Sequence, residues 1–305
     1  MKILFASQIE PAGRWLPLLK EVLPQDEFIL EPGNGVDVAL VAHPPAGTLE
    51  KLKGTKLIQS LWMGVERLLA DPAYPKGVPL ARLVDPGMVA AMSETVLYHV
   101  LDWHRRQYRY RENQQAGRWH RFRQYMAPDH TVGILGLGEL GTDAARKLLA
   151  LGFNVAGWSR RPKNVPQVKS FSGPEGLGEM LSISDVVVCL LPLTAQTKGI
   201  LNRDNLAKIK KGGGLINVAR GPHVPVPDLL AALDSGQIAH AYLDVFDVEP
   251  LPAESPLWRH PGVTLTPHSA ALTEPRTAVK RVAENVERVR RGEAPLNLVD
   301  FRAGY

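Results

Sequence analysis

The chain has almost no cysteine and no long uninterrupted apolar segment. Cys189 is the one cysteine among 305 residues, so no disulfide can form within a chain, which excludes the disulfide-stapled folds of small secreted proteins. No stretch approaches the roughly 20 apolar residues of a membrane-spanning helix. The opening MKILFASQIE has too short an apolar run for a signal peptide. A cytoplasmic protein without membrane association is the simplest interpretation.

The net positive charge of the chain is confined to one short segment. The formal net charge is +5, and residues 104–123 hold seven arginines against one acid, Glu112, so the remainder has no net positive charge. Basic and aromatic residues interleaved in this way could bind nucleic acid. The alternative is a solvated or subunit-facing helix and arm. No nucleic-acid motif accompanies the segment, so we favour the alternative and expect no nucleic-acid partner.

The length of the chain indicates about two domains. Over the first 100 residues, short apolar runs alternate with helical patterns, which predicts parallel strands connected by helices. The last strand of this series is expected at 80–83, and a long helix over 88–110 that could bridge two domains. This half has no glycine-rich phosphate loop, so it is a candidate partner domain for a cofactor domain that follows it.

Residues 131–150 carry the most informative pattern, TVGILGLGELGTDAARKLLA. An apolar strand leads directly into Gly136-x-Gly138-x-x-Gly141, and an amphipathic helix follows, which is the context of a dinucleotide-binding fingerprint. The first glycine allows the sharp turn, the second lets the backbone approach a pyrophosphate, and the third lets helix and strand pack closely. The N–H groups at the start of the helix would then face the phosphates.

The strand after this helix, expected at 154–158, ends in Ser159-Arg160-Arg161. NAD enzymes usually carry a carboxylate near this point, which binds the ribose hydroxyls. Here no acid would repel a 2′-phosphate, and two guanidinium groups could bind one. We therefore expect NADPH to be preferred, with NADH possible. The alternative is a pair of surface arginines in a loop.

Three polar residues follow successive apolar strands at the points where ligands bind in such sheets. Arg220 follows GLINVA, Glu249 follows AYLDVFDV and His268 follows VTLTP. An arginine can grip a carboxylate in a fork, a histidine can exchange a proton near neutral pH, and a glutamate can orient the ring and favour its charged form. Together they predict an acid–base site. A further loop, Leu61-Trp62-Met63-Gly64, could hold a small anion on its N–H groups or could simply connect a strand to a helix.

The chain resembles the D-isomer-specific 2-hydroxyacid dehydrogenase family. The resemblance rests on GLGELG (136–141), CLLPLT (189–194), INVARG (216–221), LDVFDVEP (243–250) and LTPHSAA (265–271). The stretches SLWMGVERLL (60–69), GWSRR (157–161) and PLWRHPGVTLTPH (256–268) are most similar to its glyoxylate/hydroxypyruvate reductase branch.

This resemblance implies an α/β fold with two Rossmann-like domains, one flavodoxin-like and one dinucleotide-binding, with parallel sheets and an interdomain cleft. We expect residues 1–99 and 275–305 to form the discontinuous substrate domain and residues 100–274 the dinucleotide-binding domain. Family members usually dimerise through the segment corresponding to 100–125, so a homodimer is expected, and no metal is expected.

The resemblance also implies roles for individual residues. Arg220 would bind the carboxylate and carbonyl of a 2-oxo acid, His268 would protonate the carbonyl oxygen, and Glu249 would hydrogen-bond His268. Asp244 would contact the nicotinamide carboxamide. Substrate would be held by Trp62, Met63, Gly64, Arg220 and His268, with Val65 adding a backbone N–H. The residues expected to hold the cofactor are Gly136, Gly138, Glu139, Leu140, Gly141, Ser159, Arg160, Arg161, Leu191, Pro192, Val218, Ala219 and Asp244.

The implied activity is NADPH-dependent reduction of a small 2-oxo acid, of the glyoxylate or hydroxypyruvate type, to the D-2-hydroxy acid. A dinucleotide-sensing, corepressor-like protein without turnover is the alternative. One departure from the family is the loop GPHVPVPDLL. Its prolines Pro222, Pro225 and Pro227 stiffen the backbone and remove N–H donors, which puts the helix start expected at Asp228 in doubt.

Overall fold

The computed structural model describes all residues from 1 to 305, and the chain divides into two compact units. Unit 1 comprises residues 1–88 and 272–305, and unit 2 comprises residues 89–271. Each unit contains one all-parallel sheet with helices packed on it, so the predicted α/β class with two domains is confirmed. No helix is both long enough and apolar enough to cross a lipid bilayer.

The first division lies earlier in the chain than the expected boundary at 99/100, and the second lies slightly before 274/275. The reason is the packing of helix α3 (Pro86–His104). Its side chains Met92, Val96 and Val100 belong to a hydrophobic cluster of unit 2, so most of this helix is part of the second unit.

The sheet of unit 1 has the strand order β2-β1-β3-β4-β5. Its strands are β1 (Lys2–Ser7), β2 (Glu27–Ile29), β3 (Val38–Ala42), β4 (Leu57–Ser60) and β5 (Leu80–Ala81). The last of these is shorter than the expected 80–83. Beyond Ala81 the backbone leaves the ladder, because Arg82 N–H donates to Asn297 O and Leu83 N–H donates to Trp62 O.

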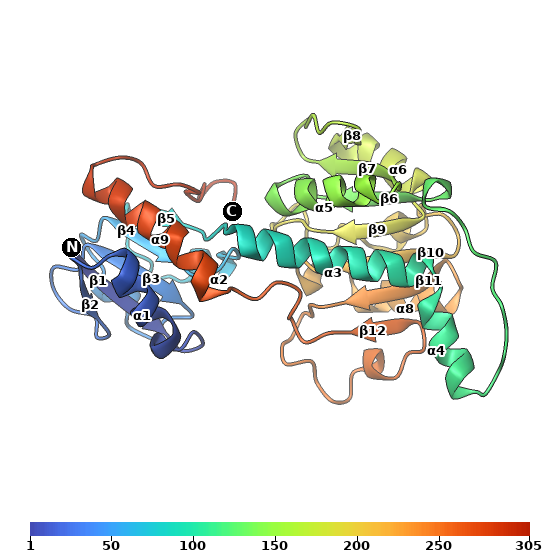
Figure 1. The fold of residues 1–305 in the computed structure, drawn as a ribbon, viewed down its shortest axis with the longest axis horizontal. Helices are drawn as coiled ribbons and strands as arrows, with labels where there is room; N and C mark the ends of the chain where they lie inside the picture. Colours follow the sequence, from blue (N-terminus) through green and yellow to red (C-terminus); the bar gives the residue numbers. More distant parts are fainter. The chain divides into compact units, whose positions relative to one another are not determined.

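Two helices from opposite ends of the chain pack side by side in unit 1 (Figure 1). They are α1 (Ala12–Val22) and α9 (Pro275–Arg290). Trp15 and Leu19 of α1 share one buried cluster with Val282 and Val286 of α9 and with Phe5 of β1. Burial of apolar surface contributes roughly 25 cal/mol per Å², so this cluster explains why the C-terminal segment returns to the first unit. The smaller elements are η1 (Leu49–Lys51) and α2 (Glu66–Ala70).

Unit 2 has seven strands in the order β12-β11-β10-β9-β6-β7-β8. The chain starts in the middle, at β6, builds outward through β7 and β8, then crosses back to β9 and builds outward in the other direction. This is a doubly wound Rossmann arrangement, whose ligands bind where the order reverses. The strands are β6 (Thr131–Leu135), β7 (Asn154–Ser159), β8 (Lys169–Ser172), β9 (Val186–Cys189), β10 (Gly213–Asn217), β11 (Ile238–Leu243) and β12 (Val263–Leu265).

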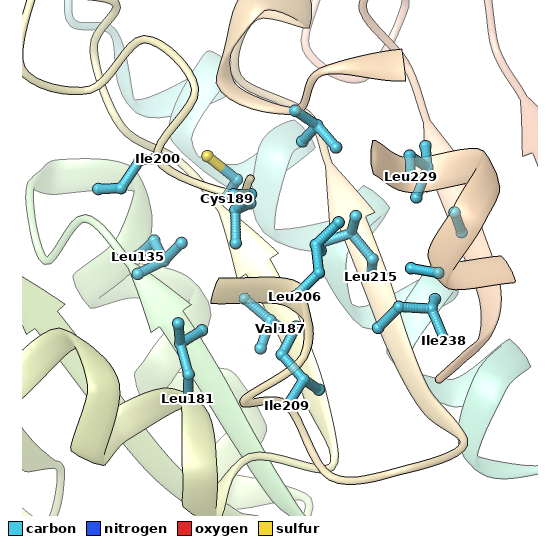
Figure 2. Close-up of a cluster of buried hydrophobic side chains, with 14 of the residues drawn as sticks. Leu135, Leu181, Val187, Cys189, Ile200, Leu206, Ile209, Leu215, Leu229 and Ile238 are labelled. Carbon is cyan, nitrogen blue, oxygen red and sulfur yellow. The ribbon is translucent and has the colours of Figure 1, made fainter. Parts of the chain in front are cut away.

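Hydrophobic clusters cover both faces of this sheet. Figure 2 shows one of them, in which Leu135, Val187 and Leu215 from three strands meet helix residues such as Leu181 and Leu229. The other cluster holds Val132 and Ile216 with residues of α3 and α5. Strands buried on both faces are near-continuously apolar, which accounts for sequences such as VVVC and GGLIN. The helices and 3-10 turns are α4 (Gln107–Gln115), η2 (Ala127–Asp129), α5 (Glu139–Ala150), α6 (Gly173–Ile183), α7 (Arg203–Leu206), η3 (Gly221–His223), α8 (Val226–Asp234) and η4 (Pro256–Trp258).

The prediction of a single helix over 88–110 is wrong, because the chain forms two helices, α3 and α4, separated by Arg105 and Arg106. Arg106 has φ of 57°, a left-handed conformation that ends an α-helix. The break is bridged by a bidentate ion pair in which Arg111 of α4 donates to Asp102 of α3, with N–O distances of 2.6 and 2.9 Å.

Candidate active site

The loop between β6 and α5 has the geometry of a dinucleotide-binding turn. Gly136 has φ of +104°, and a Cβ there would lie 2.9 Å from the carbonyl oxygen of Leu190 at the end of β9. A Cβ on Gly141 would overlap the carbonyl oxygen of Gly136. Gly138 has nothing within 4 Å of the place where its Cβ would lie. The outer two glycines are therefore required by close packing, and the middle one borders open space.

Helix α5 begins directly after this open space. Its N-cap residue is Gly138, and no side chain caps the helix. The first N–H groups of an uncapped helix, together with the positive end of its dipole, favour an anion. The loop therefore fits a pyrophosphate in shape and in charge. Four further residues expected at the cofactor follow the neighbouring strands β9 and β10, namely Leu191, Pro192, Val218 and Ala219.

The three residues expected to bind the 2′-phosphate on the cofactor's ribose lie at the carboxyl end of β7, the neighbour of β6. Ser159 Oγ donates to Arg161 O at 2.7 Å, which closes a tight turn there. Arg160 and Arg161 are both exposed, and the segment 154–161 contains no acid. This end of β7 therefore carries positive charge without a carboxylate that would exclude a 2′-phosphate.

The carboxyl ends of three adjacent strands, β10, β11 and β12, carry the residues expected to do the chemistry. Of these, His268 and Glu249 are brought together directly, with His268 Nδ1 2.7 Å from Glu249 Oε2. The other carboxylate oxygen of Glu249 accepts from Phe246 N–H at 2.9 Å. Because Nδ1 faces the carboxylate, Nε2 is the nitrogen that remains for a substrate. The side chains are 47% and 35% exposed, so the pair is accessible from outside the core.

Asp244, at the end of β11, has a set of partners that the sequence did not predict. Its carboxylate is buried and accepts from Thr266 Oγ1 at 2.6 Å, Ser269 N at 2.8 Å and Ala270 N at 3.0 Å. The backbone of His268 is tied to the same residue, because its N–H donates to Asp244 O at 2.8 Å. Asp244 therefore organises the loop that carries the histidine, and its contact with a nicotinamide carboxamide stays a prediction.

Arg220 is held through its backbone by Asn217, the last residue of β10. Asn217 Nδ2 donates to Arg220 O at 2.9 Å, and its Oδ1 accepts from Ala219 N at 3.3 Å. The guanidinium itself donates to Ala219 O at 2.6 Å. We did not single out Asn217 from the sequence, although asparagine at the end of a strand is typical of a side chain that closes a turn on its own backbone.

The loop after Arg220 is compact in spite of its prolines. A Cβ on Gly221 would overlap the backbone of Phe246 and Asp247, so the loop carrying Arg220 packs against the one leading to Glu249. His223, fully buried, has Nδ1 3.0 Å from Arg220 O and Nε2 3.3 Å from Pro192 O. It joins the ends of β9 and β10 and was not predicted as a site residue, since nothing in GPHV marks it.

Helix α8 begins at Val226, earlier than the expected Asp228, with Pro225 as its N-cap and Pro227 in its first turn. Proline is tolerated there because the first-turn N–H groups have no partner inside the helix.

The loop expected to hold the substrate carboxylate belongs to unit 1 and follows β4. The hydroxyl of Ser60 accepts from Trp62 N at 3.0 Å and donates to Trp62 O at 2.9 Å. The following N–H groups, of Met63, Gly64 and Val65, donate no hydrogen bond. The indole Nε1–H of Trp62 donates to Glu10 Oε1 at 2.9 Å, a contact over 52 positions of sequence that no local pattern could indicate.

Comparison with known proteins identifies the family. The model of the D-isomer specific 2-hydroxyacid dehydrogenase NAD binding domain matches residues 97–270. A glyoxylate/hydroxypyruvate reductase A of Serratia proteamaculans is 42% identical over an alignment of 313 positions, which covers all of both chains. A relative from Klebsiella pneumoniae with the same name is also 42% identical over both full lengths.

Two crystal structures are similar over essentially the whole chain. A D-isomer specific 2-hydroxyacid dehydrogenase from Xanthobacter autotrophicus Py2, in complex with NADPH and MES, has a TM-score of 0.96 and 42% identity, covering 100% of this chain and 99% of that one. An NADPH-dependent glyoxylate/hydroxypyruvate reductase from Sinorhizobium meliloti, in complex with NADP and sulfate, has a TM-score of 0.93 and 35% identity with the same coverage. The chain therefore belongs to the D-isomer-specific 2-hydroxyacid dehydrogenase family, on its glyoxylate/hydroxypyruvate reductase branch, and is an NAD(P)-dependent 2-hydroxyacid dehydrogenase.

Proposed function

We propose that this enzyme uses NADPH to reduce a small 2-oxo acid, of the glyoxylate or hydroxypyruvate type, to the D-2-hydroxy acid. The observation that carries the proposal is the hydrogen-bonded pair of His268 and Glu249, 2.7 Å apart at the carboxyl edge of the unit 2 sheet. Relatives that align over the full length are named for glyoxylate and hydroxypyruvate reduction. A protein that only sensed a dinucleotide would need no such acid–base pair.

His268 is the proton donor in this proposal. Its Nδ1 faces Glu249, so a protonated ring presents Nε2–H to the carbonyl oxygen of the substrate. Bound NADPH would supply the hydride to the carbonyl carbon. The carbonyl oxygen takes the proton from Nε2 as negative charge develops on it, which leaves a neutral imidazole and a hydroxyl group. Glu249 holds the orientation of the ring throughout, through its hydrogen bond to Nδ1.

Each unit carries donors of its own that suit a carboxylate. The guanidinium of Arg220 can grip the carboxylate and the carbonyl oxygen in a fork. The N–H groups of Met63, Gly64 and Val65, which donate no hydrogen bond within the chain, can bind the carboxylate as a backbone anion site.

The cofactor site in this proposal begins at the glycine loop. The open space beside Gly138 and the uncapped start of α5 would receive the pyrophosphate. The exposed Arg160 and Arg161, with Ser159, would bind the 2′-phosphate that distinguishes NADPH from NADH. Crystal structures of two relatives were obtained with NADPH and NADP, which supports this preference.

We further propose a homodimer formed through residues 100–125. After α4 the chain runs without helix or strand over 116–126, and the large side chains Trp119 and Met126 are 93% and 72% exposed there. Large exposed apolar side chains on an irregular arm are typical of a surface that another chain covers. The arginines of this segment then serve the interface and not nucleic acid.

A panel of 2-oxo acids with each reduced cofactor tests the function. Absorbance of NADPH or NADH should fall with glyoxylate and hydroxypyruvate, and chiral chromatography of the product from hydroxypyruvate should give the D form. Absence of turnover with every 2-oxo acid, while NADPH still binds, would favour the dinucleotide-sensing alternative. Formation of the L product would contradict the assigned stereochemistry.

A further inference from the structure

Glu10 lies just after β1 and joins two tryptophans. Its Oε1 accepts from the indole of Trp62 at 2.9 Å, and its Oε2 accepts from the indole of Trp15 at 3.1 Å. No ion pair of the structure includes Glu10. Both oxygens of this carboxylate are thus engaged by neutral indole donors, although a carboxylate more commonly pairs with a cation.

The two tryptophans differ in how firmly they are held. Trp15 is fully buried in the hydrophobic core of unit 1, where its ring lies 6.3 Å from that of Phe5. Trp62 is only partly buried. The backbone of Glu10 is itself fixed, because its N–H donates to Ser7 Oγ at 2.6 Å. The carboxylate therefore connects a rigid core residue to a residue on the rim of the unit.

Trp62 stands at the start of the loop that, under the proposed function, holds the substrate carboxylate. Its backbone is locked by Ser60 on both its N–H and its C=O. With the main chain fixed, the indole has only its side-chain torsions left, and the hydrogen bond to Glu10 selects one orientation among them. Under the proposed function, a ring fixed in this way would keep a constant position beside the bound acid.

We propose that Glu10 is a specificity-determining positioning residue, which holds the Trp62 ring and places a negative charge beside it, so that the site takes small 2-oxo acids with an uncharged substituent and rejects 2-oxo dicarboxylates. This inference rests on the proposed function. Removal of the carboxylate frees the ring, and removal of its charge alone ends the repulsion of a second carboxylate. The two effects can be separated by the choice of variant.

The experiment compares kinetics of wild type, Glu10→Gln, Glu10→Ala and Trp62→Phe with glyoxylate, hydroxypyruvate and oxaloacetate. Glu10→Ala should raise KM for the two small acids by about 5–10-fold, because an interaction of a charged acceptor is lost. Glu10→Gln keeps one acceptor oxygen, which can serve the Trp62 indole while the NH2 group faces Trp15. KM for the small acids should then change less than about threefold, while kcat/KM for oxaloacetate relative to glyoxylate should rise about tenfold. The pH profile of kcat should stay the same in all variants, since Glu249 and His268 are untouched.

A double-mutant cycle shows whether Glu10 acts through the ring. If it does, Glu10→Ala added to Trp62→Phe should change KM for glyoxylate no further, whereas independent effects would multiply. A second readout needs no activity. The indole N–H resonance that disappears in Trp62→Phe should shift upfield in Glu10→Ala and stay near its wild-type position in Glu10→Gln.

The outcomes separate this inference from the proposed function. A wild type that reduces none of the acids overturns the proposed function and the inference with it. The role of Glu10 alone is overturned if the wild type reduces glyoxylate but the Glu10 variants keep its ratio of kcat/KM for oxaloacetate to that for glyoxylate. It is likewise overturned if the effects of Glu10→Ala and Trp62→Phe on KM multiply in the double mutant. Glu10→Ala could fail to fold because Trp15 loses its partner. In that case the role of Glu10 is still tested by the kcat/KM for oxaloacetate relative to glyoxylate in Glu10→Gln and by the KM for glyoxylate of Trp62→Phe.

Discussion

The carboxylate of Asp244 accepts a hydrogen bond from the backbone N–H of Ser269, with 2.8 Å between N and Oδ1. Thr266 Oγ1 and Ala270 N donate to the same carboxylate, so the donors lie on both sides of His268. The loop that carries the histidine is therefore attached to the end of the neighbouring strand β11. Each hydrogen bond to a buried charged group typically contributes about 1.5–3 kcal/mol, which makes this attachment strong.

Replacement of Asp244 tests whether that attachment positions the histidine. In Asp244→Asn, an NH2 group replaces one of the two carboxylate oxygens. At least one of the groups that donate to Asp244 therefore loses its acceptor. We expect a fall of tenfold or more in kcat and a lower melting temperature, with the Kd for NADPH changed less. A large rise in the Kd for NADPH with a normal melting temperature would favour instead the predicted contact with the carboxamide.

The acid–base pair makes a prediction about pH. Reduction consumes a proton that His268 donates, so reduction should be slower at high pH than at low pH, and oxidation of the hydroxy acid should show the opposite dependence. Glu249→Gln replaces the carboxylate that accepts from His268 Nδ1 and should lower kcat for reduction, because the ring is held less firmly. His268→Ala should lose about 10²–10⁴-fold in kcat while NADPH still binds. Near-normal turnover of His268→Ala would show that another group donates the proton.

From the positive charge at the end of β7 we predict the cofactor preference. The double change Ser159→Asp and Arg160→Ala should reverse the preference from NADPH to NADH, because a guanidinium is lost and a carboxylate is placed near the 2′-position. Each charge-assisted contact contributes about 1.5–3 kcal/mol, so selectivity should change tenfold or more in the ratio of kcat/KM values. Lys211→Ala is the control, because Lys211 lies at the amino end of β10 and its loss should leave selectivity unaltered. Equal use of both cofactors by wild type would refute the assignment.

The irregular arm makes a prediction about assembly. Sedimentation should give a mass of about twice 33.5 kDa, as expected for the commonest closed assembly. Trp119→Ser removes the most exposed aromatic side chain of the arm and should weaken the dimer. Retention on heparin and DNA at physiological salt should be weak. A protein that is monomeric at micromolar concentration and binds DNA would support the nucleic-acid interpretation of the arginines instead.

Two buried histidines make a prediction about acid stability. Burial lowers the pKa of His104 to about 4, with the nearby His130 adding to the effect, and burial likewise lowers the pKa of His240 to about 4. The unfolded chain binds protons on both below pH about 6.5, whereas the folded chain does so only near pH 4. The free energy of unfolding should therefore fall as the pH decreases from 6.5 to 4, by on the order of 3 kcal/mol for each histidine at most.

Thermal melts across that pH range check this dependence. His104→Phe removes one proton site and should make the melting temperature less sensitive to acid. His120→Gln changes an exposed histidine and should leave the dependence as it is in wild type. If melting temperature depended on pH in the same way for wild type and His104→Phe, the assignment of acid sensitivity to His104 would be contradicted.

Local patterns in the sequence were enough to predict the elements that carry the cofactor site. The run from Thr131 to Ala150 predicts strand, glycine turn and helix, because the glycines meet steric demands of the turn that no other residue satisfies. The alternation of apolar runs and helical patterns likewise predicts parallel sheets, since both faces of such a sheet are covered. The order of Arg220, Glu249 and His268 along three strand ends predicts their common edge.

Other features could not be predicted because they depend on contacts between distant segments. The break at Arg106 is stabilised by an ion pair between Asp102 and Arg111 across two helices. Strand β8 (Lys169–Ser172) has no apolar pattern and exists because it pairs with β7. The membership of α3 in unit 2 follows from its packing on the core of that unit.

The amino-acid sequence by itself determined the family and the dinucleotide fingerprint, and it predicted which side chains react, because these inferences depend on residue type and on spacing within one strand, turn or helix. Only the tertiary structure decided what holds those side chains in place. Asp244 could be assigned to the histidine loop, and Glu10 to Trp62, only once the strand ends were assembled. A hydrogen bond between residues 26 or 52 positions apart is set by how the sheet is built, and no periodicity of the chain encodes it.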